Sequence, residues 1–141
     1  MKSSILAVLA ASLCAWAIAS AGERELTGDL RALQGKWKVW LAKDDYIVLE
    51  IHADTLTMTR NWPSGLRESA TGSFTINEKP SPKQMTWNNV RGGGLNLEIN
   101  KCIYELYGDT WLLIGGANDR PEYFYSGNGE PHKAWILKRE R

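Results

Sequence analysis

The fold of this chain can be inferred from the segment Asp29-Leu30-Arg31-Ala32-Leu33-Gln34-Gly35-Lys36-Trp37. Leu26, Leu30 and Leu33 recur at helical spacing and predict a short helix over 25–33, which Gly35 ends as glycine commonly does. From Lys36 onward, apolar residues recur at every second position, as they do in strands. The closing segment, 135–140, also has strand character. We therefore expect these two regions to be the first and last strands of one small barrel.

The residues between these two regions predict further strands. Alternating runs are separated by turn-forming residues and recur at roughly 8–12-residue spacing, which is typical of an antiparallel sandwich or barrel. We expect an all-β fold, a single antiparallel barrel of about eight strands with a short N-terminal helix. The glycines at 92–94 predict a flexible connection. The predicted strands cover 36–41, 46–52, 55–62, 71–76, a run starting at 85, 95–106, 111–114, 123–125 and 132–139.

Residues 1–21 have the pattern of a secretory signal peptide. A positive start is followed by an apolar run over 5–18 and by the small residues Ala19-Ser20-Ala21. This run is shorter than the roughly 20 apolar residues of a membrane-spanning helix. We expect cleavage and export to the periplasm or the medium, which leaves one domain, 22–141. Lipidation of Cys14 is an alternative that we disfavour, because the preceding Leu13 is not small.

Charge and cysteine content argue against a nucleic-acid-binding protein and against a fold held by disulfides. Lys2 is the only charged residue of 1–21, so cleavage lowers the basic residues from 17 to 16, against 16 acidic residues. A neutral chain lacks the positive field that attracts nucleic-acid phosphates. Cys102 is then the single cysteine, so no intramolecular disulfide is expected. Its strand-like, apolar neighbours predict a buried and unreactive thiol.

The sequence contains no recognisable catalytic or metal-binding constellation. His52 and His132 are far apart, and neither has a Cys, Asp or Glu at metal-ligand spacing. No nucleophile elbow or His-Glu-x-x-His motif is present, and the glycines at 92–94 do not open a helix as a phosphate loop does. We therefore expect no enzymatic activity, no metal and no cofactor.

Arg60 is the residue whose position most suggests binding. Strand alternation places it on the same face as Met58 and Trp62, which is the predicted barrel interior. A guanidinium in an apolar interior is costly unless it is paired. One hypothesis is that Arg60 binds a carboxylate or phosphate of a ligand, while Trp62, Trp87 and Tyr104 line an apolar pocket.

Two structural alternatives to this ligand-binding role remain open. Arg60 lies near the end of its strand, so its side chain can reach water at the barrel mouth. It can also pair inside the barrel with Glu98 or Glu105.

Four segments of the chain resemble a known family. The segments 29–39, 103–110, 120–124 and 137–140 are similar, in this order, to small, mostly exported bacterial lipocalin-like domains that are abundant in planctomycetes. That family often begins with Leu-Gln-Gly-Thr-Trp, and here Lys36 replaces the threonine. The resemblance covers residues 29–140. It implies a lipocalin-like β-barrel and no particular activity.

The resemblance also implies a structural role for the Gly35-x-Trp37 motif. In lipocalins, this tryptophan plugs the closed end of the barrel, and a basic residue of the last strand packs over it. Arg139 is the expected partner, with Lys138 as the second choice. A cation over an indole face contributes on the order of 1 kcal/mol. Gly35, Trp37 and Arg139 are therefore expected to form a structural latch.

These patterns predict an exported, non-enzymatic binding module that holds a small apolar or amphipathic ligand in its barrel. The alternative is a protein-interaction or envelope-structural module with a filled core and no ligand. Trp40 and Trp135 are placed opposite the apolar stripes and are candidates for such a contact surface. Neither function involves nucleic acid or a stable membrane span after signal cleavage.

Overall fold

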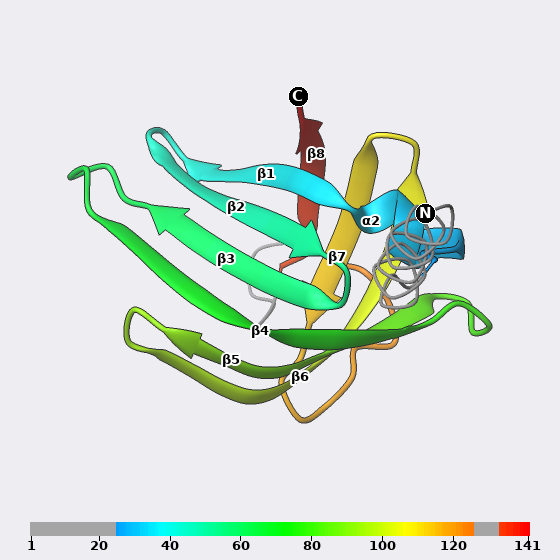
Figure 1. The fold of residues 1–141 in the computed structure, drawn as a ribbon. Coiled ribbons are helices and arrows are strands. Elements are labelled where there is room, and N and C mark those ends of the chain that lie inside the picture. The colour runs from blue at the N-terminus through cyan, green and yellow to red at the C-terminus, as the bar shows by residue number, and fades with distance from the viewer. Residues whose placement is uncertain (1–24, 126–132) are drawn as a thin grey trace, which may run out of the picture.

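Eight strands close into an antiparallel barrel in the computed structural model, which describes residues 25–125 and 133–141 (Figure 1). Each strand pairs with the next, and the first strand also pairs with the last. The predicted all-β fold is confirmed, whereas the predicted signal peptide, 1–21, lies outside the described residues. The elements are α2 (Gly28–Leu33), β1 (Gly35–Ala42), β2 (Asp45–His52), β3 (Thr55–Asn61), β4 (Arg67–Asn77), β5 (Lys83–Gly92), β6 (Leu95–Tyr107), β7 (Thr110–Gly115) and β8 (Trp135–Glu140).

The two ends of the barrel differ in how they are covered. Helix α2 lies at one end, beside the β2–β3, β4–β5 and β6–β7 connections, and we call this the closed end (Figure 1). The β1–β2, β3–β4 and β5–β6 turns lie at the other end, which we call the open end. Alternating side chains fill the interior, as in β2, where Ile47, Leu49 and Ile51 are all buried.

The closed end is filled by aromatic side chains and held by Arg139. The indole Nε1 of Trp37 donates a 2.8 Å hydrogen bond to the carbonyl oxygen of Leu33, and its ring meets that of Trp111 edge to face, with centroids 5.6 Å apart. Arg139 lies over the Trp37 ring, as expected of the latch. Lys138, the second choice of partner, donates instead to Thr110.

Gly35 takes part in this arrangement through its backbone. Its φ of +111° is one that residues with side chains rarely adopt. A Cβ at this position would also lie 3.3 Å from Nη1 of Arg139, which is a tight contact. Glycine is therefore required where α2 turns into β1.

Three details of the fold differ from the sequence-based expectations. The helix is shorter than 25–33, because it begins only at Gly28, whose φ of +58° marks the change from the extended residues before it. The glycines at 92–94 form the tight turn of the β5–β6 hairpin rather than a flexible connection. The predicted strand at 123–125 is wrong. Strand β7 pairs directly with β8, so neither strand has a free edge with which these residues could pair. These residues lie in the connection between β7 and β8 instead.

Candidate functional site

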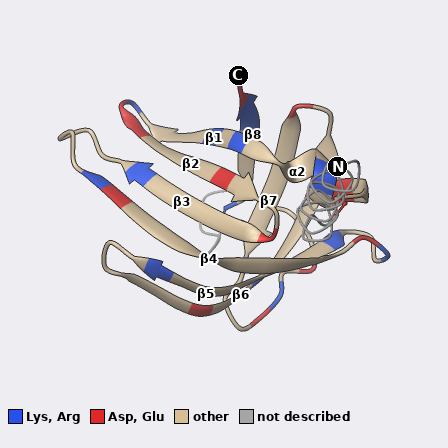
Figure 2. Ribbon diagram, in the orientation of Figure 1, with Lys and Arg blue, Asp and Glu red and all other residues tan. Residues whose placement is uncertain are grey.

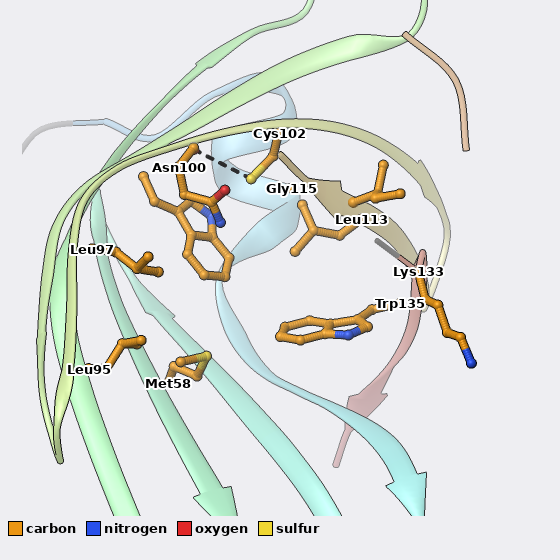
Figure 3. Close-up of a pocket in the computed structure, with 11 residues that line it drawn as sticks. Met58, Leu95, Leu97, Asn100, Cys102, Leu113, Gly115, Lys133 and Trp135 are labelled. Atoms are coloured by element: carbon orange, nitrogen blue, oxygen red, sulfur yellow. Dashed lines mark hydrogen bonds between the residues drawn. The ribbon is translucent and has the colours of Figure 1, made fainter. Parts of the chain in front are cut away.

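The interior of the open half contains a cavity with two adjoining lobes. The first lobe has a volume of about 300 Å³ and lies between β3, β5, β6, β7 and β8 (Figure 3). In Figure 3, Met58, Leu95 and Leu97 face the ring of Trp135 across this space. Trp87 also lines the lobe, so its walls are largely apolar and aromatic.

The second lobe has a volume of about 370 Å³ and lies closer to β4 and the glycine turn. It shares Met58, Leu95 and Trp135 with the first lobe, so these three side chains stand between the two spaces. The wall of the second lobe also contains polar side chains, namely those of Arg60, Glu68 and Ser69. The cavity therefore combines an apolar region with a polar one.

Small residues on β4 leave this space open. Glu68, Ala70, Gly72 and Phe74 share the inner face of the strand, and Ala70 is buried with only a methyl group as its side chain. A Cβ at Gly72 would lie 2.7 Å from the carbonyl oxygen of Asn88, so glycine permits the close approach of β5.

Arg60 is paired within the protein. Its Nε and Nη2 atoms donate to the two carboxylate oxygens of Asp45 at 3.2 and 3.0 Å, which is a bidentate ion pair. Its Cζ atom also lies 3.4 Å from the centre of the Trp62 ring. The prediction that Arg60 faces the interior is confirmed, since it lines the second lobe.

The expected pairing of Arg60 with Glu98 or Glu105 is wrong. Both glutamates are on β6, which is three strands away from β3 around the barrel. Asp45 is on the neighbouring strand β2 and has the same strand parity as the buried Ile47. The carboxylate that Arg60 binds therefore comes from a neighbouring strand and not from β6.

The predicted pocket residues do not all meet in one place. Arg60 and Trp62 line the second lobe and Trp87 lines the first, whereas Tyr104 lines neither. The Tyr104 hydroxyl donates a 2.9 Å hydrogen bond to Asp29 of α2, and its side chain is completely buried. Burial, followed by this hydrogen bond, raises the pKa of Tyr104. Its placement in a ligand pocket is therefore corrected to a contact that holds α2 to the barrel.

Trp135 is the main cavity residue for which the sequence pattern predicts the wrong face of the strand. It was expected on an outward face, but Trp135 shares the inner face of β8 with the buried Leu137, while Ile136 points outward and is 58% exposed. The sequence did contain a signal for this, because Trp135 and Leu137 are two residues apart and must share one face of the strand. The predicted exposure of Trp40 is confirmed, with 58% of this residue accessible.

Cys102 lies in the wall of the first lobe without being reactive there. It is fully buried, and its Sγ atom is 3.5 Å from the carbonyl oxygen of Asn100 (Figure 3). Burial raises the pKa of the thiol to about 12, although the charge of Arg120 opposes this shift. The predicted buried thiol is confirmed, and the thiolate needed for nucleophilic chemistry is disfavoured at neutral pH.

Within residues 25–125 and 133–141, no group of three or more His, Cys, Asp or Glu side chains is arranged to hold a metal ion. None of the helices in the described ranges has both the length and the apolar character needed to cross a membrane. Comparisons with family models, curated proteins and solved structures find no match to this chain. The geometry of the cavity is therefore the basis for a functional proposal.

Proposed function

We propose that this protein is an exported, non-enzymatic binding module that holds a small amphipathic ligand in the open half of its barrel. Export is proposed from the signal-like pattern of residues 1–21. Binding is proposed from the cavity.

The observation that carries the binding proposal is the contrast between the two halves of the barrel. Trp37, Trp111 and Tyr104 are completely buried in or beside the closed end. The open half instead retains two lobes of about 300 and 370 Å³ that share three wall residues. Ligand sites are commonly apolar cavities of about 300–1,000 Å³ with a few polar groups. A barrel of eight strands is wide enough for one small ligand.

A cavity-filling variant tests this proposal. Decanol serves as an uncharged amphipathic probe, and its binding is followed by the fluorescence of tryptophans such as Trp135 in the cavity wall. Leu97→Trp places a larger ring in the first lobe and is expected to weaken decanol binding at least tenfold. Leu66→Trp is the matched control, because Leu66 is 54% exposed in the β3–β4 turn.

The outcome that overturns the proposal is equally specific. If decanol fails to bind the unaltered protein, or if Leu97→Trp binds it unchanged while remaining folded, the cavity is not a binding site. Native mass spectrometry of the protein purified from its own host supplies an independent readout. A small molecule that co-purifies with the unaltered protein but not with Leu97→Trp supports the proposal and gives the ligand mass.

A second candidate function, protein interaction, is favoured by one surface feature. Trp40 and Tyr46 lie on the outer face of β1 and β2, with ring centroids 4.8 Å apart. The ammonium of Lys38 lies 4.3 Å and 4.0 Å from the centres of these two rings. Exposed aromatic residues are frequent anchors of protein interfaces. Trp40→Ser should then abolish binding of a partner protein and leave decanol binding intact, whereas loss of decanol binding would contradict a separate surface role.

A further inference from the structure

Three charged residues form a row at the inner rim of the open end. Asp45 on β2 binds Arg60 on β3, and Arg60 is directly opposite Glu68 on β4. Strand parity places all three on the inner face, and Figure 2 shows charged positions of these strands gathered at this end of the barrel. Two carboxylates and one guanidinium give the row a formal charge of −1.

Arg60 already has a carboxylate partner within the protein, which offsets the charge that would attract an anionic ligand. Two of its nitrogen atoms already donate to Asp45, and its guanidinium plane is stacked on Trp62. An anion that replaced Asp45 would leave the Asp45 carboxylate, whose side chain is only 14% exposed, without its partner. The geometry therefore disfavours the carboxylate or phosphate ligand that the sequence suggested for Arg60.

Glu68 is the charged group that remains available to a ligand. It is half-buried, it lines the second lobe, and it makes no ion pair within 25–125 and 133–141. The glycine turn packs against it, because a Cβ at Gly93 would lie 2.9 Å from the Cβ of Glu68. An unpaired carboxylate in a partly buried site favours a cation, since burial strengthens the attraction between opposite charges.

The walls beside Glu68 suit a cation that carries apolar groups. Trp62 and Trp135 line the same lobe, and an indole face attracts an ammonium group. One face of Trp62 is already occupied by Arg60, so Trp135 is the ring that remains for this contact. Lys133 lines the first lobe, but its exposed side chain extends away from Leu95 and Met58 in Figure 3, and it does not line the second lobe that contains Glu68.

We infer that the ligand of this cavity is a cationic amphiphile, whose ammonium group is bound by Glu68 beside Trp135 and whose apolar chain occupies the first lobe. This inference rests on the proposed binding function. It goes beyond that function because it assigns the charge of the ligand and the residue that recognises it. The shared chemistry is an alkyl ammonium, as found in free amines and in some lipid headgroups.

Probes of equal chain length test the inference. Decyltrimethylammonium, decanol and decanoate are titrated separately as monomers into the folded protein. Decyltrimethylammonium is expected to bind at least tenfold more tightly than decanoate. Glu68→Gln should remove this preference, so that decyltrimethylammonium and decanoate bind with affinities within about twofold of each other. Glu98→Gln is the matched control, because Glu98 is exposed on the outward face of β6 and should retain the preference.

The outcomes separate this inference from the proposed function. Equal or tighter binding of decanoate, or an unchanged preference in Glu68→Gln, overturns the ammonium assignment while decanol binding still supports a ligand cavity. Failure of all three probes overturns both proposals. Decylphosphocholine distinguishes the source of the cation: binding as tight as that of decyltrimethylammonium supports a lipid headgroup, and weaker binding supports a free amine.

Discussion

The Cζ atom of Arg139 lies 4.2 Å from the centre of the Trp37 ring, and these two residues are direct partners across the β1–β8 ladder. The guanidinium also donates to the carbonyl oxygens of Gln34 and Ala32 at 2.7 and 2.6 Å. These oxygens belong to the C-terminal end of α2 and the residue that follows it. Arg139 therefore joins the last strand, the first strand and the helix that covers the closed end.

Loss of this guanidinium should destabilise the whole barrel. A cation over an indole contributes about 1 kcal/mol, and each hydrogen bond from a charged group contributes about 1.5–3 kcal/mol in favourable cases. Because these contributions are not additive, we expect Arg139→Met to lower the free energy of unfolding by about 3 kcal/mol. Urea denaturation measures this change. Arg91→Met, at an exposed position, should cost less than about 0.5 kcal/mol, and an equal loss in both variants would contradict the latch.

The ion pair between Arg60 and Asp45 should appear as coupling in a double-mutant cycle. The pair is bidentate, but the Arg60 side chain is 34% exposed, so solvent weakens the attraction. We expect Arg60→Ala and Asp45→Ala each to lower the free energy of unfolding by about 1–2 kcal/mol, with a coupling of about 1 kcal/mol. Thermal and urea unfolding of the four proteins give this value. Strict additivity would show that the pair contributes nothing to stability.

Asp29 should make the attachment of α2 dependent on pH. Burial alone raises the pKa of Asp29, but hydrogen bonds from Lys83 and Tyr104, together with the charge of Lys83, outweigh burial and hold it below the ordinary value of 3.8. A lowered folded-state pKa gives stability that is fully present above the unfolded pKa and is lost as pH falls through the folded pKa. The contribution should therefore be complete at neutral pH and disappear in acid, below 3.8.

Asp29→Asn measures this contribution. We expect it to lower the free energy of unfolding at pH 7 by about 1 kcal/mol, a low value because the carboxylate is partly open to solvent. Urea titrations from about pH 7 down to pH 2 should show the difference from the unaltered protein shrinking below about pH 4. Asp119→Asn, at an exposed position, provides the control. A difference that stays constant with pH would exclude the charge of Asp29 as its cause.

Cys102 should be protected from alkylation in the folded protein. Its thiol is fully buried, and burial raises its pKa to about 12, so the thiolate is scarce at pH 8. Iodoacetamide at this pH should leave the peptide containing Cys102 unmodified in the native state and modify it fully in concentrated urea. Mass spectrometry of the digested protein measures both states. Rapid modification of the native protein would show that the lobe wall opens to solvent.

The strands that alternate clearly were predictable from the chain alone. Ile47, Leu49 and Ile51 repeat every second residue, and a strand that buries one face requires this pattern. The same rule placed Arg60 on the inner face beside Met58. The helix ahead of Gly35 was also visible, because its leucines repeat at helical spacing.

The pattern was ambiguous where both faces of a segment are apolar. In β8, Trp135 and Leu137 alternate with Ile136, and parity alone did not show which set faces inward. Pairing with β7 decides this, because Leu137 is opposite the buried Trp111. The aromatic run at 123–125 resembled a strand for the same reason, yet no neighbouring strand was left to pair with it.

The all-β class, the short helix and the inward direction of Arg60 thus follow from the amino-acid sequence, because these features depend on the local period of apolar residues. The folded barrel was needed to show that Asp45 pairs with Arg60, that Tyr104 belongs to the closed end and that Glu68 makes no ion pair among the described residues. These relations depend on strand order and register around a closed barrel. Register brings together residues that are distant in sequence, and no local pattern specifies which distant residues will meet.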